Sequence, residues 1–320
     1  MIISALIILG IALLVAIIVV VLVLSFMPLG VLFILSDISF VFVYYVFRYR
    51  RRVVRTNLER SFPEKSVPEL RRIERQFYLH LCDMLFEGIY NLRAKPERLM
   101  KHYVIKNRDL VNKYYEQGRS VVLMSAHYNN WEFMITTLDL QVRHHGIGVG
   151  KPINNKRIGT KVTQLRSRYG TEIVDQTNVR EVMAYYDRYH VPVAYMMLSD
   201  QSPSNPYRSY WTQFLHQDTA FLYGAEHFAR KYNMPVLYYE VDKVRRGYYE
   251  VTFHDMVPDV ASVPEGHVTQ RYAQELERAI REEPQYWLWS HRRWKLTRNG
   301  RILKDGSIKI IEDKRKTTQQ

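Results

Sequence analysis

The chain has 320 residues, with 46 lysines and arginines against 32 aspartates and glutamates, so its formal net charge is +14 at pH 7. This length suits one large domain, or one domain with an appendage. The charge favours an anionic partner: a membrane surface, a phosphorylated substrate, an acidic protein or a nucleic acid. Its single cysteine, Cys82, excludes an intrachain disulfide and a CxxC zinc site.

The N-terminal segment is apolar. Residues 1–36 contain no charged side chain, and residues 1–24 are almost wholly Ile, Leu, Val and Ala. A helix of that length can cross a hydrocarbon core about 30 Å thick, and the lack of a basic start argues against a cleaved signal peptide. A second apolar stretch, 31–47, predicts a helix at the membrane interface or packed on the first, with a two-span hairpin as the alternative. We therefore expect residues 1–47 to be a membrane anchor containing an N-terminal transmembrane helix.

A basic run over residues 48–55 follows directly. Basic residues next to an apolar segment stay on the cytoplasmic side of a membrane, and each attracts anionic lipid by about 1 kcal/mol. The run could instead contact nucleic acid, but its position beside the apolar segment favours the membrane. Residues 48–304 are therefore expected to form a cytoplasmic domain, and the polar residues 305–320 a frayed tail.

The rest of the chain predicts an α/β fold, with a mostly parallel sheet flanked by helices. Ser66 and Glu69 have the spacing of a capping box at the start of a helix, with Pro68 in its first turn. The predicted strands are 121–126, 147–150, 172–174, 191–198, 235–241 and 249–253. The predicted helices between and after them are 131–143, 155–169, 178–189, 219–232 and 266–282.

The segment 121–132 places an imidazole and a carboxylate around a predicted turn. A continuous helix would set His127 and Glu132 about 140° apart, too far to meet. A strand that ends at His127, followed by a turn through two asparagines and a helix from Trp131, could bring them together. Asparagine tolerates the left-handed conformation that such a turn uses. The pair would then lie at the carboxyl end of a strand, where open α/β sheets usually bind their ligands.

Such a pair has a chemical use. The neutral imidazole of His127 can take a proton from a hydroxyl that attacks a carbonyl. A carboxylate on the other ring nitrogen, here Glu132, would fix the tautomer and stabilise the imidazolium that forms. No enzyme nucleophile is needed, because the acceptor oxygen itself attacks. The alternative is a structural histidine, with Glu132 favoured only by the dipole of its helix.

Three further clusters carry polar groups. Arg166 lies in the last turn of a predicted helix that Gly170 ends, where it could bind a phosphate or an oxyanion, or only complement the helix dipole. Asp200 follows the strand 191–198 and could form a turn, fix Arg166 or position the acceptor. The segment 287–295 interleaves tryptophans with cations, which suits a nucleic-acid surface or, as we favour here, an interfacial membrane anchor. No metal motif is present, so no metal or other cofactor is expected.

Taken together, these blocks resemble the bacterial lipid A biosynthesis acyltransferases, the late lauroyl/myristoyl transferases of the lysophospholipid acyltransferase superfamily. The resemblance covers nearly the whole chain. One departure is Asn129, where the family usually has glycine, but asparagine also suits a left-handed turn. The matching blocks, in chain order, are Arg51–Arg55 with Asn57-Leu58 and Phe62-Pro63-Glu64, His127–Glu132, Arg166 with Gly170, Asp200-Gln201 and Ser290–Lys295.

The resemblance implies a glycerolipid-acyltransferase-like fold and an O-acyltransferase at the cytoplasmic face of the bacterial inner membrane. The acyl donor would be acyl carrier protein, and the acceptor a hydroxyl of a lipid A precursor, with no cofactor and no nucleic acid. His127 would be the general base and Glu132 would orient it. The expected substrate-binding or oxyanion-stabilising residues are Arg166, Asp200 and Asn130.

Two other functions fit the same residues. A lysophospholipid or ornithine-lipid acyltransferase would use the same machinery on another acceptor. A non-enzymatic, membrane-anchored protein that binds lipid or nucleic acid would bind without turnover and would be indifferent to mutation of His127.

Overall fold

A sheet of seven strands, in the order β1-β9-β8-β2-β5-β3-β4, organises the computed structural model, which describes residues 10, 16, 19–153, 155–303 and 305–313. All neighbours in this sheet are parallel except β8 and β9, which pair antiparallel. This confirms the predicted α/β fold with a mostly parallel sheet. The strands are β1 (Tyr103–Ile105), β2 (Val121–Ser125), β3 (His145–Gly150), β4 (Glu172–Asp175), β5 (Val193–Leu198), β8 (Val236–Arg245) and β9 (Tyr248–Val257).

Two apolar layers cover the faces of this sheet. Successive side chains of a strand point to opposite faces, so Val122 and Met124 of β2 join one cluster while Val121 and Leu123 join the other. Burial on both faces explains why β2 reads as an unbroken apolar run. One layer contains α9 (Val179–Arg188), α10 (Gly224–Lys231) and α11 (His267–Glu282), and the other contains α5 (Pro96–His102), α6 (Arg108–Glu116) and α7 (Trp131–Gln141).

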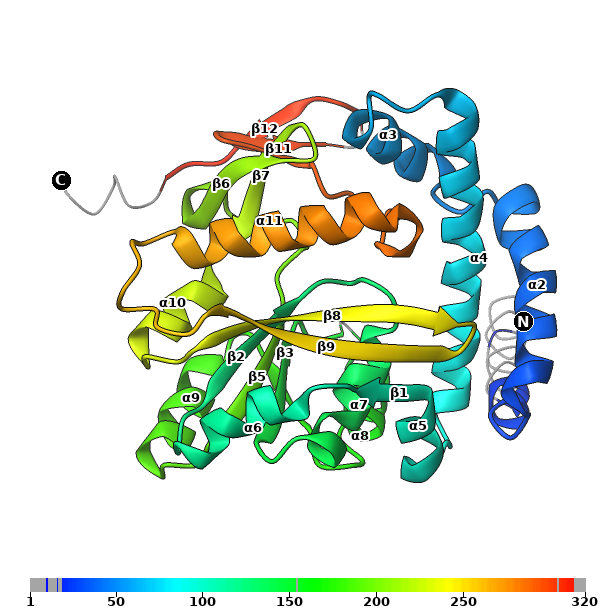
Figure 1. The fold of residues 1–320 in the computed structure, drawn as a ribbon. Helices are drawn as coiled ribbons and strands as arrows, with labels where there is room; N and C mark the ends of the chain where they lie inside the picture. Colours follow the sequence, from blue (N-terminus) through cyan, green and yellow to red (C-terminus); the bar gives the residue numbers. More distant parts are fainter. Residues whose placement is uncertain (1–9, 11–15, 17–18, 154, 304, 314–320) are drawn as a thin grey trace, which may run out of the picture.

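A long helix, α4 (Val67–Asn91), borders the sheet, and the N-terminal helices pack against it. It begins with the predicted capping box, in which the backbone N–H of Ser66 donates to Glu69 at 2.8 Å. The helix α2 (Leu29–Val41), extended by η1 (Phe42–Val46), lies alongside α4, and α3 (Arg51–Ser61) crosses near its start (Figure 1). Cys82 of α4 is buried.

The segment Leu29–Val46 is the one candidate for a membrane span among the described residues. Its mean hydropathy is 2.1 over 18 residues, and only 28% of it is buried in the protein, so most of its apolar surface faces outward. It coincides with the second predicted apolar helix. The first, 1–24, lies for the most part outside the described residues.

The basic run after this segment contacts protein as well as solvent. Arg51 and Arg55 of α3 both bind the buried Glu74 of α4, at 3.0 and 3.2 Å. Arg50 donates to the backbone oxygen of Ser290 at 3.0 Å. The ion pairs of Arg51 and Arg55 therefore hold α3 against α4, and the hydrogen bond of Arg50 joins the run to the segment around Ser290.

The C-terminal half contains small sheets that the sequence pattern did not predict. Part of the predicted helix 219–232 is the strand β7 (Gln217–Leu222), which pairs with β6 (Ser209–Phe214) in a hairpin. Its turn residues, Leu215 and His216, have φ of 49° and 61°, as a two-residue hairpin turn requires, but lack the Asn-Gly type of signal.

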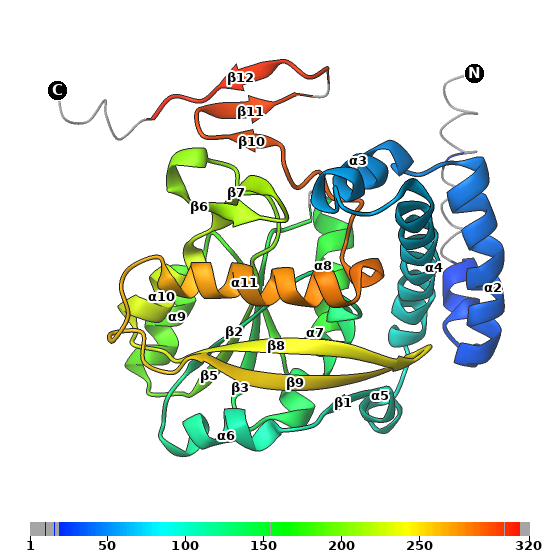
Figure 2. The same ribbon diagram turned by 45° about the horizontal axis from the view of Figure 1, so that its top comes forward.

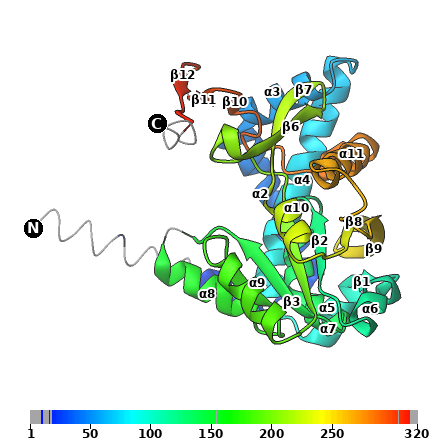
Figure 3. The same ribbon diagram turned by 90° about the vertical axis from the view of Figure 1, so that its left-hand side faces the viewer.

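A second small sheet joins β10 (Leu296–Thr297), β11 (Gly300–Ile302) and β12 (Ile308–Ile310), so the tail expected to be frayed is ordered at least over β12. It lies beside the β6–β7 hairpin, across α11 from the main sheet (Figure 2). A perpendicular view shows these small sheets at one end of the molecule and α6 to α9 at the other, with α8 (Lys156–Arg166) among them (Figure 3). Two short turns of helix, η2 (Pro206–Arg208) and η3 (Pro284–Tyr286), complete the described elements.

Candidate active site

The turn after β2 has the predicted conformation. β2 ends at Ser125, Asn129 adopts a left-handed conformation with φ of 50°, and α7 begins at Trp131. The side-chain oxygen of Asn130 accepts a hydrogen bond from the backbone N–H of Phe133 at 3.0 Å, which caps α7. The turn therefore leaves His127 at the carboxyl end of the central strand.

Asp200 is the carboxylate that binds this histidine. The Nδ1 atom of His127 lies 2.7 Å from Oδ1 of Asp200, and Nε1 of Trp287 donates to the other carboxylate oxygen at 3.0 Å. β2 and β5 are parallel neighbours in which Ser125 pairs with Leu198. His127 lies two residues after Ser125, and Asp200 lies two residues after Leu198. The register of the sheet therefore brings the two side chains together.

The environment of the pair adjusts both pKa values. Burial alone would lower the pKa of His127, but the charge and hydrogen bond of Asp200 and the nearby charge of Glu132 raise it above its ordinary value. Burial alone would raise the pKa of Asp200, but His127 and the Trp287 N–H lower it below its ordinary value. At neutral pH Asp200 is thus an ionised carboxylate that accepts a hydrogen bond from Nδ1–H of His127, which leaves Nε2 as the basic nitrogen.

The prediction that Glu132 binds the ring nitrogen of His127 is therefore wrong, because Asp200 takes that place. Glu132 binds Arg166 at the end of α8 through two bonds, Nε to Oε2 at 2.9 Å and Nη2 to Oε1. It also accepts from Nε1 of Trp131 at 3.2 Å. Glu132 lies in the first turn of α7, where its side chain binds Arg166 of α8, while the loop after β5 supplies the carboxylate for the imidazole. Its effect on His127 is electrostatic.

Gln201 completes the surroundings of the imidazole. Its side-chain amide nitrogen lies 3.2 Å from Nε2 of His127. Because Nδ1–H donates to Asp200, the amide N–H of Gln201 donates to the lone pair on Nε2. Gln201 therefore occupies the ring nitrogen that Asp200 does not bind.

Asn130 has no free side-chain group for a substrate. Its oxygen caps α7, and its amide nitrogen donates to Oε2 of Glu87 at 2.7 Å within the protein interior. Glu87 on α4 is fully buried and also accepts from the hydroxyl of Tyr249. The expected oxyanion-binding role does not fit the side chain of Asn130, which instead fixes the turn to α4 and β9.

The tryptophan-rich segment also differs from its prediction. Trp287, Trp289 and Arg293 are buried, so they are part of the core and not an interfacial membrane anchor. The backbone around Trp287 pairs with the turn 127–130: the N–H of Asn129 donates to the oxygen of Tyr286, and that of Leu288 to the oxygen of His127, both at 3.1 Å. The composition of the segment showed its aromatic content but not which surface it covers. Only its proximity to Asp200 reveals Trp287 as a site residue.

A cavity of about 570 Å³ opens beside the imidazole. His127, Gln201 and Arg166 form part of its polar lining. Most other lining side chains are apolar and come from β3, β4, β5, α7 and α10, including Ile135, Val149, Ile173, Met196, Met197, Leu198 and Phe228. A long apolar chain could lie here with its reactive end at His127. Within the described part of the chain, no group of three or more His, Cys, Asp or Glu side chains is placed to hold a metal ion.

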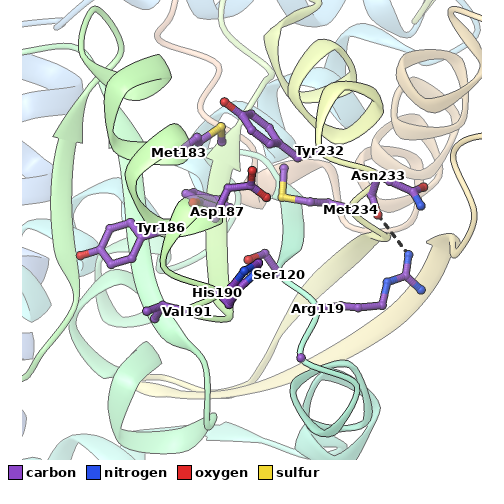
Figure 4. A pocket seen from close by; sticks show the side chains of 12 residues that line it. Arg119, Ser120, Met183, Tyr186, Asp187, His190, Val191, Tyr232, Asn233 and Met234 are labelled. Atoms are coloured by element: carbon purple, nitrogen blue, oxygen red, sulfur yellow. Dashed lines mark hydrogen bonds between the residues drawn. The ribbon is translucent and has the colours of Figure 1, made fainter.

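A second, smaller pocket of about 260 Å³ lies at the opposite edge of the sheet (Figure 4). Ser120, Val191 and Met234, which line it, precede β2, β5 and β8 respectively. It is therefore at the amino ends of the parallel strands, and none of the predicted site residues lines it. The larger cavity is the candidate active site, because it joins His127 to Arg166.

Comparison with known proteins identifies the family of the chain. Residues 4–296 match the model of the bacterial lipid A biosynthesis acyltransferase family. The lipid A biosynthesis palmitoleoyltransferase of Escherichia coli (strain K12) is 22% identical over 253 residues, which cover 77% of this chain and 79% of that protein. The lipid A biosynthesis acyltransferase of Shigella flexneri matches with the same identity and coverage. The chain therefore belongs to the bacterial lipid A biosynthesis acyltransferases, a family of transferases.

Proposed function

We propose that this protein transfers a fatty acyl chain from acyl carrier protein to a hydroxyl of a lipid A precursor, with His127 as the general base. The observation that carries the proposal is the imidazole of His127, which lines an apolar cavity and is bound to Asp200 through Nδ1, while the side-chain amide of Gln201, which the acceptor hydroxyl would displace, binds Nε2. A base needs one nitrogen held and the other free to meet the acceptor. The cavity suits a chain of methylene groups, each worth about 0.8 kcal/mol when buried.

The chemistry follows from these positions. Nε2 of His127 takes the proton of the acceptor hydroxyl while that oxygen attacks the thioester carbonyl. Asp200 holds Nδ1–H and stabilises the imidazolium that results. When the tetrahedral intermediate collapses, the carbon–sulfur bond breaks and the imidazolium returns its proton to the thiolate. An ester forms, a thiol leaves, and the histidine ends in its starting state.

Arg166 is the proposed stabiliser of negative charge on the reacting carbonyl or on a substrate phosphate. Glu132 accepts hydrogen bonds from two of its nitrogens, and a guanidinium carries further N–H donors for a substrate oxygen. Pairing with Glu132 fixes a long side chain that would otherwise lose conformational entropy on binding. In this proposal Glu132 acts on catalysis through Arg166 and through its charge near His127.

Charge and hydropathy support the proposed donor and location. Acyl carrier protein is acidic, and a chain with a net charge of +14 attracts it. The span Leu29–Val46 and the adjacent basic run support a domain attached to the cytoplasmic face of the inner membrane, where a lipid acceptor is available.

The test is transfer by the purified full-length protein in detergent, with acyl carrier protein thioester as donor and a lipid A precursor as acceptor. His127→Ala should abolish transfer, whereas His254→Ala, a change of a half-exposed histidine on β9, should leave it intact. Lipid extracts from a deletion strain identify the acceptor: a change in lipid A acyl number supports the proposal. A change confined to phospholipids or ornithine lipids, or near-normal transfer by His127→Ala, would overturn it.

A further inference from the structure

Four cations, one lining the active-site cavity and three in the C-terminal segment, have no carboxylate partner among the described residues. Lys151 follows β3 and lines the cavity together with His127 and Gln201. Arg292, Lys295 and Arg301 belong to the C-terminal segment and are half-buried. None of the four forms an ion pair with a carboxylate in the part of the chain that the structure describes.

The C-terminal sheet brings these cations to the loop that carries Asp200. The backbone N–H of Ile302 donates to the oxygen of Lys295 at 2.8 Å, so Lys295 and Arg301 are neighbours across paired strands. Nη2 of Arg301 donates to the backbone oxygen of Ser204 at 3.0 Å, which fixes its guanidinium beside the loop 199–204. The Nε atom of Arg301 is buried and has no hydrogen-bond partner among the described residues.

The charges repel one another. Burial lowers the pKa of Lys295 below its ordinary value, and the charges of Arg301, Lys151 and Arg292 lower it further. By contrast, Arg298 on the same small sheet binds Asp218 through two bonds of 2.8 Å. Half-buried cations that lack compensating charge cost folding free energy, so their retention beside the cavity points to an anion that is bound during function.

We propose that Lys151, Arg292, Lys295 and Arg301 form a binding site for a phosphate group at the mouth of the cavity. The site deepens the function proposed above, because it would hold one end of a substrate whose reactive group lies at His127. Guanidinium and ammonium groups are the usual ligands of phosphate oxygens. A small tetrahedral anion suits three half-buried side chains better than the face of an acidic protein, which would meet fully exposed cations.

The phosphate could come from either substrate. A thioester on acyl carrier protein is joined through a phosphodiester, and a lipid A precursor carries phosphates on its headgroup. The test variants are Lys295→Ala and Arg301→Ala, and the substrate whose binding they weaken identifies the source. Arg298→Ala is the matched control, because it removes a cation next to the same small sheet that already binds a carboxylate. Thermal unfolding of each full-length variant in detergent checks that the fold is retained.

The first measurement is independent of turnover. Inorganic pyrophosphate is titrated calorimetrically into the wild-type protein and the three variants. Removal of one charge-assisted contact should weaken binding by about tenfold in Lys295→Ala and Arg301→Ala, with no change in Arg298→Ala. If the wild-type protein does not bind pyrophosphate, or if all four proteins bind it equally, the phosphate site does not exist. This result decides the proposal even if the protein shows no transfer.

The second measurement identifies the source with three donors: acyl carrier protein thioester, acyl-phosphopantetheine and acyl-N-acetylcysteamine. A rise in KM of about tenfold for both phosphate-bearing donors, but not for acyl-N-acetylcysteamine, assigns the site to the donor phosphodiester. A rise in KM for the lipid acceptor with all three donors assigns it to the headgroup phosphate. A rise confined to the carrier-protein thioester would indicate a protein-docking surface and would overturn the proposal.

Discussion

His127 and Asp200 each lie two residues beyond the end of a strand. The residues that end those strands, Ser125 and Leu198, are paired in the parallel register of β2 and β5. The 2.7 Å contact between the two side chains is therefore set by the sheet and not by a flexible loop. Backbone bonds from the segment 286–288 support the same turn. Such rigid support is what a base needs if it is to meet its substrate in one geometry.

Replacing Asp200 by asparagine should reduce kcat by about two to four orders of magnitude, because the imidazole loses the charge that fixes its tautomer and stabilises its cation. The pKa of His127 should also fall, since Asp200 is the main group that raises it. A general base works when unprotonated, so the acidic limb of the pH profile of kcat/KM should move to lower pH. A limb at the wild-type position would show that Asp200 does not control His127.

Glu132 and Arg166 should behave as one unit. Because Glu132 binds Arg166 through two hydrogen bonds, we expect Glu132→Gln and Arg166→Gln each to slow transfer by at least about tenfold, and the double variant to cost little more than the more severe single one. If Glu132 instead acted directly on His127, the two effects would multiply. A double-mutant cycle on kcat/KM distinguishes these outcomes, with Arg168→Gln as a control for a neighbouring arginine bound to Asn91.

Local features of the site could be predicted from the sequence. The left-handed turn at Asn129 follows from the residue type, and the position of His127 follows from an apolar strand that ends just before it, at Ser125. Both depend on neighbours along the chain. The capping box at Ser66 is local in the same way.

The identity of the carboxylate on His127 could not be predicted, because it depends on which strands are neighbours. A strand pattern gives the ends of β2 and β5 but not their order in the sheet. The sequence therefore favours Glu132, which is nearer along the chain, as the partner of His127. The same reason explains why Trp287 and Glu87 were missed: each reaches the site from a distant segment. Composition also could not show whether the segment 287–295 faces lipid or the core.

Glu87 should make stability depend on pH. Burial raises its pKa from 4.5 to about 7. A carboxyl whose pKa is raised on folding stabilises the fold below its unfolded pKa, and this contribution is lost as pH rises through the folded value. The wild-type protein should therefore lose stability between about pH 4.5 and 7, and Glu87→Gln, which cannot ionise, should lose less.

Thermal unfolding of both proteins in detergent at pH 5 and pH 8 tests this expectation. The unfolding temperature of Glu87→Gln relative to the wild type should be a few degrees higher at pH 8 than at pH 5. The exposed Glu97 of α5 provides a control, because Glu97→Gln should show no such difference. Equal differences at the two pH values would mean that Glu87 does not change its charge in this range.

Asp83 should hold the apolar helix α2 to the rest of the protein. It is nearly buried on α4, and it accepts a hydrogen bond from Ser36 of α2 at 2.8 Å. Two cations of the β8–β9 hairpin, Lys243 and Arg246, bind the same carboxylate at 3.3 and 2.6 Å. Removing one partner of a buried ion pair leaves uncompensated charge, at a cost of about 3–5 kcal/mol.

Asp37 offers a matched comparison, because it binds the same Arg246 from α2 but has 54% of its side chain exposed. Exposed pairs contribute about 0–1 kcal/mol, so Asp37→Asn should be nearly neutral while Asp83→Asn lowers the unfolding temperature strongly. Limited proteolysis should also cut Asp83→Asn faster between α2 and α3, because α2 loses its polar contact with α4. Similar stability in the two variants would show that apolar packing alone holds α2, and that the buried carboxylate contributes nothing to its position.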